Sequence, residues 1–319
     1  MASVFLNGEF LEGEDARIAA LDAGLQHAVG LFETVSGGIT ESGRAWCVHL
    51  EPHCRRLVSS ARELGISATL RHEALGRAIM ETLARSELDH ARVRLTITGG
   101  DLNLVRSTRR VGPEAPAPEP TVLIVAEPAT AFPGALFERG ATVMMADAKA
   151  NPFNPLEGHK TLAYWWRLRE LARAARLGGG EAIVTQVSNH LCGGCVSNVF
   201  VVRNGELLTP IARGEEGTVG ANGDAPPSGA ALPSPVLPGV VRGELLAWAA
   251  RAAQPARRRM LSINDLLGAD EVFLTNSAWG VMPVTRIEGA SIGGGEVGEV
   301  TRTAIGWWES QIEDARVGL

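Results

Sequence analysis

Three short patterns in this 319-residue sequence carry side chains that can do chemistry. The first is Val236-Leu-Pro-Gly-Val-Val-Arg242, which runs directly into a helix-like segment from Glu244. A glycine before a helix lets the backbone approach a ligand, and the free N–H groups and dipole of the first turn attract a phosphate. Taken alone, the simpler interpretation is an ordinary capped helix.

The other two patterns centre on an arginine and a lysine. In His53-Cys-Arg-Arg56-Leu, Arg56 sits on an expected helix, and its planar guanidinium can grip phosphate oxygens, although most helix arginines are only solvated. Lys160 is one of very few lysines, and Tyr164, the only tyrosine, follows four residues later. A lysine can form a Schiff base with an aldehyde, and a phenol one helical turn away can hold a neighbouring oxygen. The simpler interpretation is a surface lysine and a core tyrosine.

Composition narrows the class of partner. Hydrophobic residues make up 45% and charged residues 21%, which is typical of a soluble globular protein. Acidic residues outnumber basic ones, 36 to 30, which argues against a nucleic-acid surface, and no apolar stretch reaches the roughly 18 residues of a membrane span. We therefore expect a small-molecule ligand.

The chain has only four cysteines for its length, and no apolar leader follows Met1. Both observations favour a reducing compartment, and we expect a cytoplasmic protein. Cys192 and Cys195 have CxxC spacing, but no second pair or paired histidine completes a zinc site. They are interpreted as small apolar residues in a loop, and no metal is expected.

The elements around these patterns predict a mixed α/β fold in two domains. The first, residues 1–128, should open with a hairpin turning at Asn7-Gly8. It should continue with strands over 31–36, 45–48, 93–97 and 121–126, and with helices from Pro52 to Gly65 and over 71–85.

A linker over 129–133 leads to the second domain, residues 134–319, which would carry Lys160. Its expected elements are strands over 141–146, 182–187 and 271–275, a hairpin at Asn204-Gly205, and helices over 160–177, 239–253 and 300–314. Residues 213–235 are rich in Gly, Pro, Ala and Ser, which predicts a mobile surface loop.

In order, these segments resemble the fold type IV pyridoxal-phosphate enzymes, the class IV aminotransferases. That family includes branched-chain aminotransferases, D-amino-acid aminotransferases and aminodeoxychorismate lyases. The resemblance covers nearly the whole chain. The matching segments are Leu6–Gly8, Asp22–Thr34, His53–Leu57, Lys160–Tyr164, Ser197–Phe200, Leu208–Pro210, Leu237–Arg242, and Asp270–Ala278 with Pro283-Val284.

The resemblance implies two α/β domains with pyridoxal 5′-phosphate in the cleft between them, usually in a homodimer. It makes Lys160 the Schiff-base lysine and proton shuttle. The implied cofactor contacts are Arg56, Gly239, Val240, Val241 and Ser277 at the phosphate, Leu237 at the pyridine ring and Tyr164 at the phenolic oxygen. The backbone of Asn276, Ser277 and Ala278 would contact the substrate carboxylate.

The sequence departs from the family at one important position. The family places a glutamate five residues before the Asn of S-N-x-F, where it bonds the pyridine nitrogen and makes the ring an electron sink. Here that position is Gly193. We therefore expect slower transamination, and expect Gly193→Glu to raise it.

A second departure lies in the matching segment Asp22–Thr34, here called the Asp22 box. The family tends to show Arg, an aromatic residue, Gly and Asp where this chain has Ala23, His27, Ala28 and Val29.

Three functions stay open. The first is an aminotransferase acting on a small amino acid and a 2-oxo acid. The second is a lyase, because Phe32-Glu-Thr34 is closer to the lyase and D-amino-acid branches than to branched-chain enzymes. The third is a homologue that binds the cofactor but has lost or altered activity. Specificity for D-amino acids is not supported, since Thr98-Gly-Gly100 lacks the arginine of those enzymes.

Overall fold

The computed structural model describes residues 3–101, 119–217 and 233–318. The chain divides into two compact units. The first comprises Met1–Thr130, His159–Ala163 and Gln311–Leu319, and the second comprises Ala131–Gly158 and Tyr164–Ser310. The sequence predicts a similar division, but it assigns Lys160 to the second domain, whereas the five-residue segment around Lys160 clusters with the first unit.

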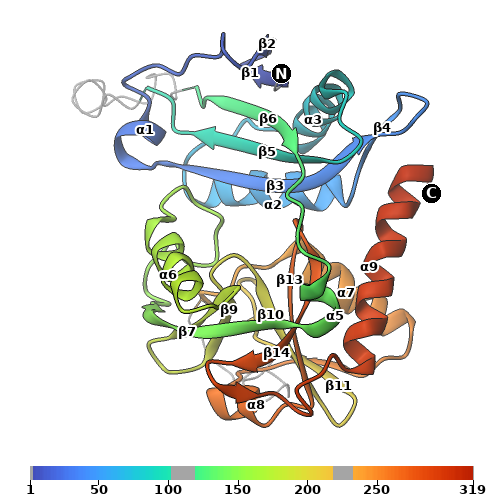
Figure 1. Cartoon of the computed structure of the whole chain (residues 1–319). Coiled ribbons are helices and arrows are strands. Elements are labelled where there is room, and N and C mark those ends of the chain that lie inside the picture. Colours follow the sequence, from blue (N-terminus) through green and yellow to red (C-terminus); the bar gives the residue numbers. More distant parts are fainter. Residues whose placement is uncertain (1–2, 102–118, 218–232, 319) are drawn as a thin grey trace. The chain divides into compact units, whose positions relative to one another are not determined.

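The first unit is an antiparallel sheet covered by helices (Figure 1). Its strand order is β2-β1-β6-β5-β3-β4. Leucine, isoleucine and valine from the sheet pack against the apolar sides of α2 and α3, which form one core with it. The elements are β1 (Ser3–Leu6), β2 (Glu9–Glu12), α1 (Ala23–His27), β3 (Gly30–Ile39), β4 (Ala45–Cys47), α2 (Leu50–Glu63), α3 (His72–Ser86), β5 (Ala91–Thr98) and β6 (Val122–Pro128).

Asp22 fixes the start of α1 in this unit. One carboxylate oxygen accepts the Gly24 N–H at 2.7 Å, and the other accepts the hydroxyls of Thr98 and Thr121, each at 2.7 Å. The helix ends at Ala28, whose φ of 55° lies in the left-handed region. The Asp22 box is therefore a structural junction between α1, β5 and the start of β6.

The second unit is built around a larger mixed sheet of order β12-β11-β10-β13-β14-β7-β8-β9, with β15 beside β14. Its strands are β7 (Ala141–Ala150), β8 (Glu181–Gln186), β9 (Leu191–Gly194), β10 (Asn198–Arg203), β11 (Glu206–Thr209), β12 (Ala256–Arg258), β13 (Glu271–Asn276), β14 (Gly280–Ile287) and β15 (Ala290–Ser291). Its helices are α5 (Ala135–Arg139), α6 (Trp165–Arg176), α7 (Val240–Arg251), α8 (Ile263–Leu267) and the first part of α9 (Glu299–Val317). The residues of α9 from Gln311 onward belong to the first unit.

The mixed α/β class in two units agrees with the sequence. Both hairpin turns form where expected, between β1 and β2 and between β10 and β11. The predicted helix over 160–177 begins too early, because α6 starts only at Trp165. The loop predicted over 213–235 lies largely outside the described residues, which stop at 217 and resume at 233.

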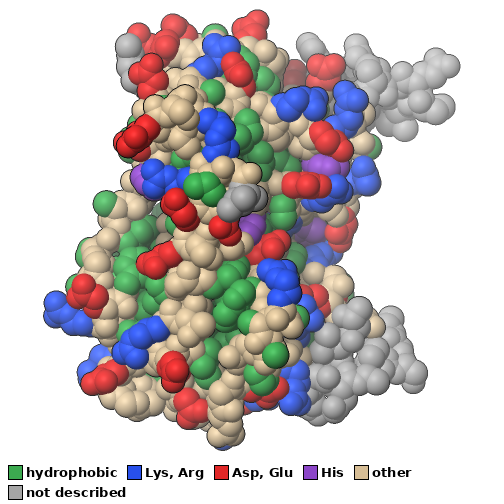
Figure 2. Space-filling model, turned by 90° about the vertical axis from the view of Figure 1, so that its right-hand side faces the viewer, with side chains coloured by type: hydrophobic (Ala, Val, Ile, Leu, Met, Phe, Trp, Pro, Cys, Tyr) green, Lys and Arg blue, Asp and Glu red, His purple; other side chains and the backbone are tan. Residues whose placement is uncertain are grey.

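The surface shows no segregation by charge on the face drawn in Figure 2, where acidic and basic side chains are interspersed. Within the described ranges, no helix has the length and apolar content required to cross a bilayer.

Candidate active site

Lys160 lies in an extended segment that pairs with β3. The Phe32 N–H donates to the Lys160 carbonyl and the Leu162 N–H donates to the Gly30 carbonyl, each at 2.9 Å. A Cβ at position 30 would lie 2.3 Å from the Ile97 carbonyl oxygen of β5 and 2.6 Å from Leu162 Cδ1, so β3 needs glycine there to lie this close to both neighbours. The lysine is therefore carried by sheet hydrogen bonds of the first unit rather than by a helix.

The side chain of Lys160 points to an aromatic ring. Its Nζ lies 4.3 Å from the centroid of Phe32, and the guanidinium carbon of Arg94 lies 4.0 Å from the same centroid. Both cations interact with the electron-rich ring. The sequence analysis did not predict Arg94. In the β3–β5 register Phe32 pairs with Thr96, so Arg94 is a diagonal neighbour of Phe32 on the same face of the sheet. Phe32 therefore carries one cation–π contact from the Lys160 segment and another from β5.

Arg56 is held by a buried carboxylate. Its Nε and Nη2 donate to the two Glu33 oxygens at 2.8 and 2.7 Å, and His53 Nδ1 lies 2.8 Å from Glu33 Oε2. Burial alone raises the pKa of Glu33, but the charges and hydrogen bonds of Arg56 and His53 outweigh it and lower that pKa to about 2. The two hydrogen bonds to Glu33 fix the orientation of the Arg56 guanidinium on α2.

The turn before α7 leaves the backbone at the start of the helix open to an anion. Gly239 precedes the helix, no side chain caps its N-terminus, and its first turn holds no acidic residue. Asn198 Nδ2 donates to the Leu237 carbonyl at 2.9 Å, and a Cβ at Gly239 would lie 1.9 Å from Asn198 Oδ1. The N–H groups of Val240 and Val241 thus begin a helix whose dipole favours an anion.

A buried ion pair fastens this helix start to the rest of the unit. Arg242 is 2% exposed, and its Nη1 and Nη2 donate to Glu215 at 2.9 and 2.8 Å. Its other donors reach Thr209 Oγ1 and the Pro210 carbonyl. The Leu208–Pro210 motif therefore supports the α7 turn.

Tyr164 precedes α6 and belongs to the second unit. Its hydroxyl donates to the Cys195 carbonyl at 2.6 Å. Burial raises the pKa of Tyr164 to about 12, so the phenol stays protonated at neutral pH. The argument that placed it one helical turn from Lys160 is wrong, because residues 160–163 are not helical.

The loop after β9 is organised by Glu181. Its oxygens accept the N–H groups of Ala182, Cys195 and Val196 and the Ser197 hydroxyl at 2.9 to 3.1 Å. Burial raises the pKa of this carboxyl, and these hydrogen bonds oppose the shift. Sequence reasoning missed Glu181, whose only signal was an acidic residue opening an otherwise apolar strand.

Gly193 has no room for a side chain. Its φ is +145°, and a Cβ would lie 2.6 Å from the Ser197 carbonyl oxygen. A glutamate at this position would therefore force the loop to shift. The effect of Gly193→Glu on transamination stays a prediction.

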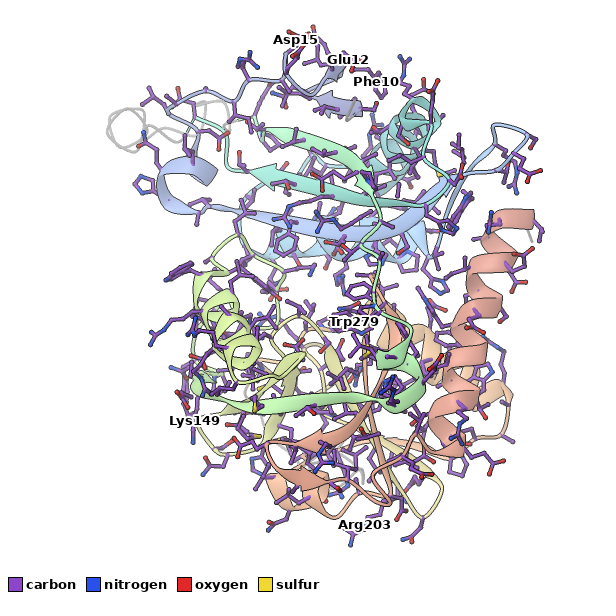
Figure 3. The ribbon with its side chains drawn as sticks, in the orientation of Figure 1. Phe10, Glu12, Asp15, Lys149, Arg203 and Trp279 are labelled. Atoms are coloured by element: carbon purple, nitrogen blue, oxygen red, sulfur yellow. The ribbon has the colours of Figure 1, made fainter. Side chains whose placement is uncertain are left out.

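The candidate substrate residues lie in the turn between β13 and β14. Asn276 Nδ2 donates to the Val196 carbonyl at 3.2 Å, while Oδ1 accepts the N–H groups of Ala278 and Trp279. Trp279 is labelled in Figure 3. Its ring packs edge-on against Phe132, with 5.6 Å between centroids. The Ala278 N–H is already engaged within the turn, which limits its use for a carboxylate.

The two units divide the predicted residues between them. Lys160 and Arg56 belong to the first. Those in the second are Tyr164, Leu237, Gly239, Val240, Val241, Asn276, Ser277 and Ala278. Among the residues that the structure describes, no cluster of three or more His, Cys, Asp or Glu could hold a metal ion.

Comparison with known proteins decides the family. The model of the amino-transferase class IV family matches residues 30–287. The chain belongs to this family. A branched-chain-amino-acid aminotransferase of Escherichia coli (strain K12) is 27% identical over 303 residues, which cover 94% of this chain and 89% of that protein.

Two solved structures extend the comparison. The branched-chain amino acid aminotransferase of T.th., solved with pyridoxamine 5′-phosphate, has a TM-score of 0.80 at 22% identity, covering 98% of this chain and 94% of that one, and shows the shared fold. The 4-amino-4-deoxychorismate lyase of Pseudomonas aeruginosa has a TM-score of 0.74 at 25% identity, with 98% of each chain covered. The similar structures thus include both an aminotransferase and a lyase, the two kinds of enzyme considered from the sequence.

Proposed function

We propose that this class IV family member is a pyridoxal-phosphate-dependent aminotransferase that moves an amino group between a small amino acid and a 2-oxo acid. The observation that carries the proposal is the pairing of the Lys160 segment with β3. It fixes the lysine in the same compact unit as Arg56 and orients its amine over Phe32.

The residues present suit this cofactor. Arg56, the N–H groups of Val240 and Val241, and Ser277 would hold its phosphate, because an uncapped helix start after Gly239 and an oriented guanidinium both favour an anion. Leu237 would lie against the pyridine ring. The Tyr164 hydroxyl donates its proton to the Cys195 carbonyl, so its oxygen would accept a hydrogen bond from the phenolic oxygen of the cofactor. When bound, the group supplies an aldehyde for condensation with amines and a ring that stabilises negative charge at the substrate Cα.

The chain's own groups would handle the proton and the carboxylate. The Lys160 amine would take the proton from the substrate Cα as a base and then give it up again as an acid. The turn at Asn276, Ser277 and Ala278 would orient the substrate carboxylate. The Arg94 guanidinium, which contacts the same ring as the Lys160 amine, would favour carboxylate-bearing substrates.

A second candidate activity is favoured by one observation. Gly193 provides no carboxylate where the resemblance expects one, and the nearby Glu181 carboxylate is committed to the loop Cys195–Ser197. A weaker electron sink would suit a homologue that binds the cofactor without transamination better than a fast aminotransferase.

The test uses the two lysines of the chain, Lys149 and Lys160. Lys149 lies on β7, where its amine bonds Asn189, and it serves as the matched control (Figure 3). After incubation with pyridoxal 5′-phosphate and reduction with borohydride, we expect mass spectrometry to find the cofactor on Lys160. Lys160→Ala should abolish the visible absorption of the complex, and Lys149→Ala should retain it.

Turnover then separates the functions. Conversion of an amino donor to its 2-oxo acid with amination of an acceptor supports the aminotransferase. Breakdown of the donor without an acceptor supports the lyase, and attachment without turnover supports the binding homologue. Attachment at Lys149 alone, or none, contradicts all three.

We also propose that the protein is a homodimer. Four large apolar side chains in residues 153–168 of the second unit are exposed: Phe153 at 71%, Leu156 at 41%, Trp165 at 77% and Leu168 at 47%. Exposed aromatic and aliphatic side chains in such numbers are typical of a protein interface, and a second copy is the commonest partner of a soluble enzyme.

A further inference from the structure

The residue before Lys160 is a buried histidine that ties the lysine segment to α2. The side chain of His159 is 3% exposed. Its Nδ1 lies 2.9 Å from Ser60 Oγ, and its Nε2 lies 3.7 Å from Glu63 Oε1. Because the Lys160 carbonyl also accepts the Phe32 N–H, the segment is held on one side by β3 and on the other by α2.

The helix that receives His159 also carries the candidate phosphate-binding arginine. His53, Arg56, Ser60 and Glu63 follow the spacing i, i+3, i+7 and i+10, which places them along one side of α2. The first two bind Glu33 of β3, and the last two face His159. One helix thus bears both Arg56 and the support of the lysine segment.

We propose that His159 is a positioning residue, which fixes the Lys160 amine through its contact with Ser60. The proposal rests on the function proposed above, since it assigns His159 a task only if Lys160 bonds the cofactor. Without the contact, the segment keeps its β3 hydrogen bonds but loses its support on the α2 side. The amine then spends less time in the orientation that reaches an aldehyde, while Arg56 keeps its bonds to Glu33.

The experiment separates attachment from phosphate binding. The rate of covalent attachment of pyridoxal 5′-phosphate to Lys160 is measured by borohydride trapping. Affinity for pyridoxine 5′-phosphate, which carries an alcohol in place of the aldehyde, reports non-covalent binding alone. We expect His159→Phe to slow attachment about ten-fold, the change that loss of one buried hydrogen bond causes, with unchanged affinity for pyridoxine 5′-phosphate.

Two further variants sharpen the test. His159→Asn should restore the rate, because an amide group at this distance along the side chain can replace Nδ1 in the bond to Ser60. Ser60→Ala should slow attachment as His159→Phe does. Ser59→Ala alters an exposed serine on the same helix and should leave the rate unchanged.

The outcomes decide between the two proposals. If wild-type protein attaches no cofactor at Lys160, the proposed function fails and His159 loses its assigned role with it. If wild type and His159→Phe attach the cofactor at equal rates, only the positioning role is overturned. Equal loss of attachment and of pyridoxine 5′-phosphate affinity also overturns it, because the whole site has then been damaged. Should His159→Phe not fold, Ser60→Ala decides by the same criteria.

Discussion

At the scale of single residues, the lowered pKa of Glu33 makes a pH dependence testable. A carboxyl whose folded-state pKa lies near 2, below the unfolded value of 4.5, stabilises the fold above pH 4.5. That contribution is lost as the pH falls from 4.5 toward 2. We expect the advantage of wild type over Glu33→Gln, measured as the free energy of unfolding in urea, to shrink on the order of 1–2 kcal/mol between pH 5 and pH 3.

The remaining carboxyls titrate alike in both proteins, so their contributions cancel in this difference. At pH 7, Glu33→Gln should be destabilised by roughly 3 kcal/mol or more, since it leaves Arg56 buried without its counter-charge. A difference that stays constant with pH would show that the pKa of Glu33 is the same in the folded and the unfolded protein.

Ala28 is a second residue with a measurable consequence. It ends α1 at a φ of 55° and a ψ of 26°, where a side chain is strained and glycine is not. The family motif has glycine at this position. We expect Ala28→Gly to raise the free energy of unfolding by about 0.5–1 kcal/mol, the strain relieved exceeding the added flexibility of the unfolded chain.

The control for this change lies in the same short helix. Ala23 is buried and helical, so Ala23→Gly should destabilise the protein. Destabilisation by both substitutions would contradict the strain at position 28.

At the scale of elements, the start of α7 depends on the ion pair between Arg242 and Glu215. Removing the Glu215 charge leaves a fully buried guanidinium without its partner, so Glu215→Gln should cost roughly 3 kcal/mol in a urea titration. Glu206→Gln breaks a more exposed pair with Arg257 and should cost less than about 1 kcal/mol. Similar costs for the two would mean that burial adds nothing to the Arg242 pair.

Sequence predicted elements best where local chemistry decides them. Asn-Gly turns fixed both hairpins, and apolar spacing located α2 and α3 within two residues of their observed starts. It failed at residues 160–164. There helix-forming Ala and Leu favoured a helix, but hydrogen bonds to Gly30 and Phe32, more than a hundred residues away, hold the chain extended.

The candidate site shows the same limit. Motifs select Lys160, Arg56 and the Gly239 turn as candidates, because each has a residue type that its proposed chemistry requires. They could not identify Glu33 and Glu181 as the supports of Arg56 and of the 195–197 loop, since those roles depend on burial and on partners distant in the sequence. Nor could they show that the backbone at Gly193 excludes a side chain.

At the scale of the whole molecule, assembly is the open prediction. Trp165→Ser removes the most exposed of the large apolar side chains and should weaken the dimer, which light scattering during size-exclusion chromatography measures as a lower mass at low concentration. Leu177→Ser removes an exposed apolar residue just beyond the far end of α6 and should leave the mass unchanged. A wild-type mass near 33.7 kDa at all concentrations would rule out the homodimer.

The short stretch His159–Ala163 makes the position of Lys160 depend on the smaller sheet. Its amide hydrogens should exchange with deuterium in step with β3, whereas those of α6, which follow directly in the chain, should exchange with the larger sheet. If mild denaturant melts the smaller sheet first, the lysine is released while most secondary structure persists. Inactivation would then precede the loss of circular dichroism, and refolding of β3 would set the pace of recovery.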